Sequence, residues 1–183
     1  MWMKSSADEI QELVIKAKNN DMEAFSSLYS DIYIDLYKCA LSIVKNTYSA
    51  EDIVSETVVA AFRSIKSLRD NSSFKSWIYV ILVNKCKKYL MDYKNQFTSI
   101  DERQDISSDE GISIEDRLEI RKTYEELDDE ERTIISLSVF AGFNSKEISK
   151  IVHKRPGSIR SIKSRGLEKM KIKLERKGIY EGY

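Results

Sequence analysis

The sequence predicts an all-α protein built from two small helical domains that a flexible acidic linker joins. Its 183 residues include only six glycines and one proline, whereas all-β folds use both residue types in their turns. Apolar residues recur at helical spacing over most of the chain. One polar stretch lacks this periodicity and divides the chain into two parts, each long enough to bury a core.

The first domain is predicted to span residues 5–94 and to contain four helices. Ser6 with Glu9, and Ser49 with Asp52, are predicted to form capping boxes that open the first and third helices. Apolar stripes define the first two helices: Ile10, Leu13, Val14 and Ala17, then Phe25, Leu28, Ile32, Leu36, Cys39 and Ile43.

The fourth helix should follow the break at residues 70–73. The apolar run 78–83 alone would also suit a strand. We expect a helix because the periodic pattern continues without a turn signal through Tyr89 and Leu90.

Residues 95–116 form the predicted linker. They carry seven acidic side chains and one arginine, with Ser, Gln and Gly between them. Few apolar residues combined with a high net charge are typical of a segment that does not fold by itself.

The second domain is predicted to span residues 117–178. A helix over about 114–127 comes first, and Asp128 with Glu131 three residues later should cap the next helix. The turn 141–144 should end that helix.

The second domain should finish with a helix-turn-helix. Ser145 is expected to cap a short helix, and Pro156 suits the first position of a longer one. Gly166 lies on the inner stripe of the longer helix with Ile159 and Ile162, where a missing side chain lets two helices approach closely.

Charge is distributed unevenly along a chain whose formal net charge is zero. Residues 146–177 carry twelve Lys or Arg against three Glu. Such a concentration suggests contact with a polyanion, although a solvated helix face is the commoner cause of a charge run.

The composition disfavours several function classes. One histidine and two widely separated cysteines, Cys39 and Cys86, leave little for a zinc site or a Ser-His triad. We therefore expect no metal, no cofactor and no enzymatic activity, and we expect both thiols to be reduced and buried. No stretch has the pattern of a signal peptide or a membrane span, so we expect a cytoplasmic protein without a membrane partner.

Four short motifs along the chain carry a resemblance to a known family. Residues 50–57, Ala-Glu-Asp-Ile-Val-Ser-Glu-Thr, are followed by Phe-Lys-Ser-Trp-Ile-Tyr at 74–79 with Asn84 after it. The second half holds Glu-Ile-Ser-Lys-Ile at 147–151 and Ser-Ile-Arg-Ser at 158–161. In this order they resemble the core-binding motif, the promoter-melting segment and the region 4 helix-turn-helix of the extracytoplasmic-function group of sigma-70 factors.

The resemblance implies three binding surfaces. The surface for core RNA polymerase comprises Asp52, Ile53, Ser55, Glu56 and Val59. The surface for the −10 promoter element comprises Arg69, Asp70, Asn71, Ser72, Ser73, Lys75, Trp77, Asn84, Lys85, Lys87 and Lys88, with residues 68–73 as the loop that captures a flipped base. The surface for the −35 element comprises Lys154, Arg155, Ser158, Arg160, Ser161, Lys163, Ser164, Arg165 and Lys169.

The sequence departs from the usual family pattern at four positions. Ser55 replaces a common Gln, Val80 a frequent Arg, Ile162 a common basic residue and Gly166 a usual Ala. The changes at 80 and 162 remove possible DNA contacts, so they affect the expected promoter preference rather than the class.

The resemblance implies a sigma factor that joins core RNA polymerase, reads the −10 and −35 elements of promoter DNA and helps to melt the duplex. It also implies a monomer when free and control by a cognate anti-sigma factor. Two alternatives remain: a dimeric helix-turn-helix regulator without a sigma role, and a helical adaptor without DNA. The first needs a self-complementary apolar surface that is not evident, and the second leaves the basic helices unexplained.

Overall fold

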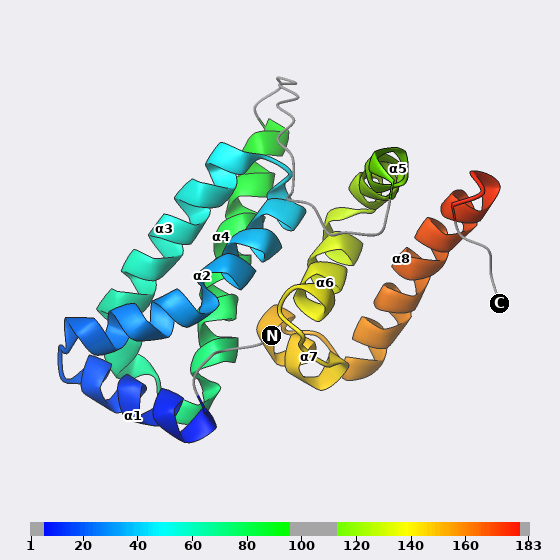
Figure 1. The fold of residues 1–183 in the computed structure, drawn as a ribbon. Coiled ribbons are helices and arrows are strands. Elements are labelled where there is room, and N and C mark those ends of the chain that lie inside the picture. Colours follow the sequence, from blue (N-terminus) through cyan, green and yellow to red (C-terminus); the bar gives the residue numbers. More distant parts are fainter. Residues whose placement is uncertain (1–5, 96–112, 180–183) are drawn as a thin grey trace.

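The regular structure of the described residues, 6–95 and 113–179, is helical throughout in a computed structural model (Figure 1). This confirms the all-α prediction. The helices are α1 (Ala7–Lys18), α2 (Met22–Val44), α3 (Thr47–Ser64), α4 (Phe74–Asn95), α5 (Ile114–Glu125), α6 (Asp129–Val139), α7 (Ser145–Val152) and α8 (Pro156–Arg176), with 3₁₀ turns η1 (Ile65–Ser67) and η2 (Asn71–Ser73) between α3 and α4.

Side-chain caps set most helix starts, and two of the expected caps are wrong. The boxes Ser6–Glu9 and Asp128–Glu131 are confirmed. Helix α3 begins earlier than expected, because the Asn46 side chain accepts from the Ser49 backbone N–H at 2.8 Å, which places Ser49 inside the first turn. Likewise α7 is capped by Asn144 and not by Ser145. In both cases an asparagine upstream of the serine caps the helix, and asparagine is as favourable at this position as serine.

The first unit, α1–α4, packs around α2 and α4. Leu28 and Leu36 of α2, and Phe74 of α4, are fully buried. Cys39 and Cys86 are unpaired and buried in the same core, which confirms their expected burial. Burial raises the pKa of both thiols, so they stay protonated at neutral pH.

The second unit, α5–α8, depends on a close approach of α6 and α8. A Cβ atom built at Gly166 would lie 2.8 Å from Cδ1 of Ile135 and 3.4 Å from Cβ of Glu131. The expected role of this glycine in helix packing is therefore confirmed.

The two units pack against each other, which the sequence did not predict. Helix α6 contacts α2, and α7 contacts α4 (Figure 1). Ile134 and Leu137 of α6 belong to the same buried apolar cluster as Leu36 of α2. Helix α6 can contact both α2 and α8 because its adjacent residues Ile134 and Ile135 lie on different sides of the helix. It is therefore apolar towards the first unit as well as towards α8.

Candidate nucleic-acid interface

Helices α7 and α8 form the expected helix-turn-helix. His153 ends α7 with φ 57°, and the backbone N–H of Lys154 donates to the Ser149 carbonyl at 3.0 Å. Pro156 then starts α8 as expected. Three buried positions, Ile159, Ile162 and Gly166, fix which side of α8 faces the core.

The opposite side of α8 is the candidate DNA-reading face. With 100° per residue, Ser161 and Ser164 lie opposite the buried stripe, and Arg160 and Arg165 flank them on either side. All four side chains are exposed, as are those of Arg155 and Ser158 near the start of the helix. The burial of Ile162 explains why a basic residue is dispensable there: the position faces the core.

All three of the expected −35 lysines are bound by their own domain. Lys163 donates to the Ser138 hydroxyl at 2.5 Å, and Lys169 lies 2.6 Å from the buried carboxylate of Glu131. Lys154 pairs with Glu130. These lysines lie at the edges of the reading face and fasten α8 and the turn before it to α6.

The basic residues of α4 point in three directions, although the sequence grouped them together. Lys85 faces α3, where its Nζ lies 2.7 Å from Oε2 of Glu56. Lys87 lines a cleft of about 220 Å³ between α4 and the first turn of α6. Lys88 is exposed, and Asn84 is exposed one turn before it.

Lys75, at the start of α4, contacts the second unit. Its Nζ donates to the Ala141 carbonyl at 2.8 Å and lies 5.1 Å from the ring centroid of Phe143. The first turn of helix α4 is thus covered in part by the α6–α7 turn, since Tyr79, four residues after Lys75, packs edge-to-face on the same Phe143 ring at 5.1 Å. Trp77 is half-buried and packs near Phe74, with 6.1 Å between ring centroids.

The turn at 68–73 is held by a dense set of hydrogen bonds. The Asp70 carboxylate accepts from the backbone N–H of Ser72 at 3.0 Å and from its hydroxyl at 2.7 Å, which lowers the pKa of that carboxyl. Ser73 donates its hydroxyl to the Asp70 carbonyl at 2.7 Å. From α1, Lys18 donates to the Leu68 carbonyl at 2.5 Å and to Oδ1 of Asn71. Arg69, within this turn, is exposed.

The expected polymerase-binding face lies on α3. Asp52, Ser55 and Glu56 are exposed, and Val59 is 49% exposed, so an apolar residue adjoins the acidic ones. Ile53 differs: it is 6% exposed and belongs to the core, so it positions the helix rather than offering a contact. The hydrogen bond from Lys85, and then its charge, lower the pKa of Glu56.

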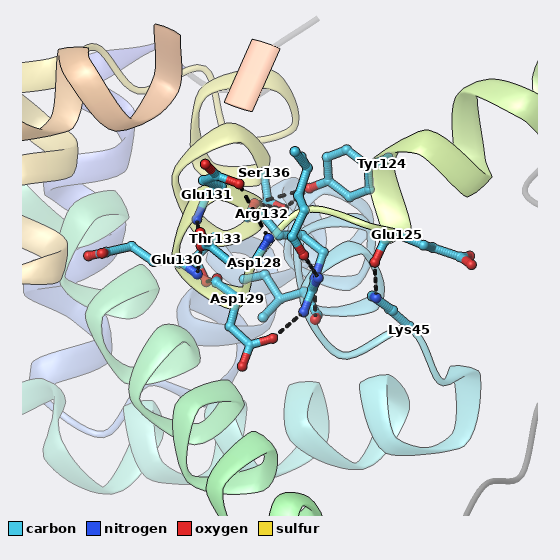
Figure 2. A network of polar contacts seen from close by, with 12 residues as sticks. Lys45, Tyr124, Glu125, Asp128, Asp129, Glu130, Glu131, Arg132, Thr133 and Ser136 are labelled. Carbon is cyan, nitrogen blue, oxygen red and sulfur yellow. Dashed lines mark hydrogen bonds and ion pairs between the residues drawn. The ribbon is translucent and has the colours of Figure 1, made fainter. Parts of the chain in front are cut away.

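Sequence reasoning missed a polar network around α6 that joins the two units (Figure 2). Arg132 is 3% exposed, and its Nε donates to the Ile43 carbonyl of α2 at 3.0 Å. Its remaining nitrogens donate to the Leu127 carbonyl at 2.6 Å and to Asp129 at 2.5 Å. In a sequence, an arginine beside a capping box resembles an ordinary surface charge. The one indication that it is buried is its position two residues before the Ile134–Ile135 pair.

The same network also includes three hydroxyl groups. The Ser42 and Ser136 oxygens are 2.6 Å apart across the two units, and Tyr124 Oη lies 2.5 Å from the same Ser136 oxygen. Lys45 donates to the Glu125 carbonyl beside them (Figure 2). Burial raises the pKa of Tyr124, which keeps its hydroxyl protonated.

Within residues 6–95 and 113–179, no group of three or more His, Cys, Asp or Glu side chains is arranged to hold a metal ion. No helix in these ranges has both the length and the apolar character needed to cross a bilayer. Most of the expected acidic linker falls outside the described residues.

Both units match family models of known proteins. Residues 28–96 match the family model "Sigma-70 region 2", and residues 117–170 match "Sigma-70, region 4". The chain is 27% identical over 165 residues to the RNA polymerase sigma factor SigV of Bacillus subtilis, covering 90% of this chain and 99% of that one. It is 24% identical over 169 residues to the RNA polymerase sigma-H factor of Pseudomonas aeruginosa, covering 84% and 88%.

Two solved structures share the fold. CnrH, in complex with the cytosolic domain of CnrY, aligns with a TM-score of 0.72 at 21% identity, over 92% of this chain and 99% of that one. The sigma factor RpoE of Bartonella quintana, in complex with the anti-sigma factor NepR, aligns with a TM-score of 0.71 at 22% identity, over 84% and 98%.

Proposed function

Since the chain belongs to the extracytoplasmic-function group of the sigma-70 family, we propose that its three candidate surfaces divide promoter-directed initiation among them. Sigma factors direct core RNA polymerase and are not themselves enzymes. The observation that carries the proposal is the exposed face of α8, where Arg160 and Arg165 flank two small serines opposite a fully apolar stripe.

That face reads the −35 element. Small serines at the centre let the helix approach the base edges in the major groove, and an arginine can donate two hydrogen bonds to a guanine. Lys163 and Lys169 hold α8 on α6, so they act by positioning the reading face. Arg155 and Ser158, near the start of the helix, contact the phosphate backbone.

The turn at 68–73 and the exposed part of α4 engage the −10 element. The Asp70 and Lys18 contacts pre-organise the turn, and they leave the Asn71 amide nitrogen available to a base edge. Asn84 and Lys88 share one exposed face of α4 that can follow the backbone of the melted strand.

The acidic face of α3 binds core polymerase. Asp52, Ser55 and Glu56 present polar groups beside the exposed Val59, so this face offers two carboxylates and one apolar contact to a partner. Lys85 fixes the Glu56 carboxylate and so selects one geometry for it.

A cognate anti-sigma factor is a further proposed partner. Support comes from the sigma factor RpoE of Bartonella quintana, which shares this fold and is in complex with an anti-sigma factor. No residue of this chain identifies that partner.

Run-off transcription with purified core polymerase and the full chain tests the proposal. Wild-type protein should give promoter-specific transcripts that core polymerase alone does not give. Glu56→Lys should weaken core binding at least tenfold while the melting temperature changes little. Glu12→Lys is the matched control, because it also reverses an exposed acid that pairs with a lysine, yet it lies on α1. A tight, sequence-specific complex with duplex DNA in the absence of polymerase would instead support the dimeric regulator.

A further inference from the structure

The exposed side of α3 changes its charge along the helix. Its first half carries the acidic residues of the proposed polymerase surface. The stretch that follows, residues 57–69, has no Asp or Glu and three exposed basic residues, which we call the basic strip: Arg63, Lys66 and Arg69. A solvated helix face commonly mixes both signs of charge, as α1 does where Glu12 pairs with Lys16. The basic strip has no such mixture.

Helix geometry places the first two bases of the strip on the side that Val59 faces. Arg63 follows Val59 by four residues, and Lys66 follows Arg63 by three, so about one helical turn separates each from the next. Ala61 and Ile65 are buried, which fixes the opposite side of this segment against the core. The face that begins as the acidic polymerase surface therefore continues as a basic face that leads to the turn at 68–73.

The three bases of the strip differ from the lysines of α1 beside them. Within residues 6–95 and 113–179, no hydrogen bond or ion pair holds any member of the strip. By contrast, Lys16 pairs with Glu12, and Lys18 donates to the Leu68 carbonyl and to Asn71. The charge of the strip is thus available to a ligand, whereas the α1 lysines already have partners.

The two acids that flank the strip in the sequence are bound by other groups. Oε2 of Glu56 lies 2.7 Å from Nζ of Lys85, and the Asp70 carboxylate accepts from the backbone N–H and the hydroxyl of Ser72. In the described part of the chain, neither carboxylate pairs with the strip. Exposed positive charge that no acid neutralises attracts a polyanion.

Hydrogen bonds hold the backbone that carries the strip. The N–H of Leu68 donates to the Ile65 carbonyl at 3.1 Å, and the Leu68 carbonyl accepts from Lys18 at 2.5 Å. Ser67 donates its hydroxyl to the Ser64 carbonyl at 2.7 Å. Both 3₁₀ turns also contact α1 (Figure 1). Because the backbone is fixed before a ligand arrives, binding costs less ordering of the chain.

We propose that the basic strip binds phosphate groups of the DNA strand whose base enters the turn at 68–73. Phosphate contacts need positive charge at a fixed position, and the strip leads directly into that turn, since Arg69 belongs to both. The proposal rests on the proposed function, because it takes the turn as part of the −10 surface. It adds Arg63 and Lys66 to the DNA-binding residues, and it gives α3 two roles: its acidic end binds polymerase and its basic end binds DNA.

Salt titration of DNA binding by the polymerase complex tests the proposal, with a promoter duplex whose −10 region is unpaired as the probe. Arg63→Gln with Lys66→Gln should lower the slope of log K against log salt by about 1.4, because each single-strand phosphate contact contributes about 0.7. Affinity at near-physiological salt should fall roughly tenfold, and equally for promoters of different sequence. Arg63→Lys with Lys66→Arg should bind as wild type does, because a phosphate responds to charge.

Lys38→Gln is the matched control, because it also removes an exposed base from the first unit, but on α2. It should leave the salt slope unchanged, and thermal unfolding should show that all variants fold alike. A wild-type slope in the Arg63→Gln, Lys66→Gln variant would overturn the proposal. Weaker binding of that variant to core polymerase would also overturn it, since the strip would then contact the polymerase.

Run-off transcription by the wild-type protein distinguishes failure of this proposal from failure of the proposed function. If the wild type gives promoter-specific transcripts while the double variant keeps the wild-type slope, the strip is wrong and the proposed function stands. If the wild type gives no such transcripts, both are wrong, because the turn at 68–73 would then receive no promoter strand.

Discussion

Helices α4 and α8 both carry basic residues assigned to promoter DNA, but the structure presents the two sets differently. On α8, Arg160 and Arg165 are exposed beside the reading face. On α4, Lys75 and Lys85 are bound by other parts of the chain. A count of charges cannot distinguish these cases. The difference lies in the side chains at the centre of each proposed surface: the two arginines of α8 face solvent, whereas Lys75 and Lys85 of α4 are held by contacts within the chain.

The largest expected effect on stability comes from disturbing the packing of α8 against α6. Gly166→Val should destabilise the protein by about 1–3 kcal/mol, because a branched side chain overpacks the contact with Ile135 and Glu131. Urea unfolding measures the loss, and −35-dependent transcription should fall with it.

Two variants control for helix propensity. Gly157→Ala adds a Cβ atom where nothing lies within 4 Å, so it should be neutral or stabilising. Gly166→Ala should cost less than Gly166→Val, because its closest neighbour is the terminal methyl of Ile135, which can shift to make room. Equal stability of Gly166→Val and wild type would show that α6 and α8 can separate freely.

The next effect concerns base reading on α8. Arg160→Ala should lose about 1–3 kcal/mol of discrimination at one −35 position, because an exposed arginine beside the reading face can bind a base edge. Competition binding of the polymerase complex to promoters that differ at single positions measures it. Arg176→Ala, at the far end of α8, is the control and should leave every preference intact. Uniform weakening across sequences would mean that Arg160 contacts phosphate.

Sequence reasoning predicted the fold class and the helix-turn-helix because both depend on local patterns. Apolar stripes, the two confirmed capping boxes, Pro156 and Gly166 act within a few residues or across one helix pair. The two wrong caps differ from these, since Ser49 and Ser145 follow an asparagine of similar capping strength by three residues and one residue, and local pattern does not decide between the two.

Contacts between distant segments could not be predicted from the sequence. The pairing of Ser42 with Ser136 joins residues 94 positions apart, and neither serine differs in sequence context from a surface serine. The burial of Ile53 within the proposed polymerase motif was also missed, because a motif match does not specify which side of the helix faces out. Arg132 was missed for the same reason as the serines.

A smaller effect separates the lysines of α4 from one another. Lys88→Ala should weaken binding to all promoters alike and lower the slope of log K against log salt by roughly 0.7–0.9, as expected for one lost phosphate contact. Lys85→Ala should change that slope less, because Glu56 already neutralises Lys85 in the free protein. Salt titrations of the polymerase complex compare the two variants. An equal drop in slope would show that Lys85 leaves Glu56 on binding DNA.

The smallest effect is the pH dependence of the Lys85–Glu56 pair. Lys85 lowers the pKa of Glu56 from its ordinary value of 4.5, so the folded state binds a proton there less readily than the unfolded chain does. The pair therefore contributes its full stability above about pH 4.5 and loses it as pH falls through the lowered pKa of the folded state. Because both side chains lie near the surface, solvent screens the pair, and the contribution is at most about 1 kcal/mol.

Lys85→Met should lower the midpoint of thermal unfolding slightly at pH 7, and the difference from wild type should disappear near pH 3. Lys88→Met, on the same helix but exposed, should show a smaller pH-dependent difference, because Lys88 lowers the pKa of Glu56 through its charge alone and less than Lys85 does. If the two variants lost stability equally at every pH, Glu56 would not be held by Lys85, and the contrast between the partnered lysine of α4 and the exposed arginines of α8 would no longer hold.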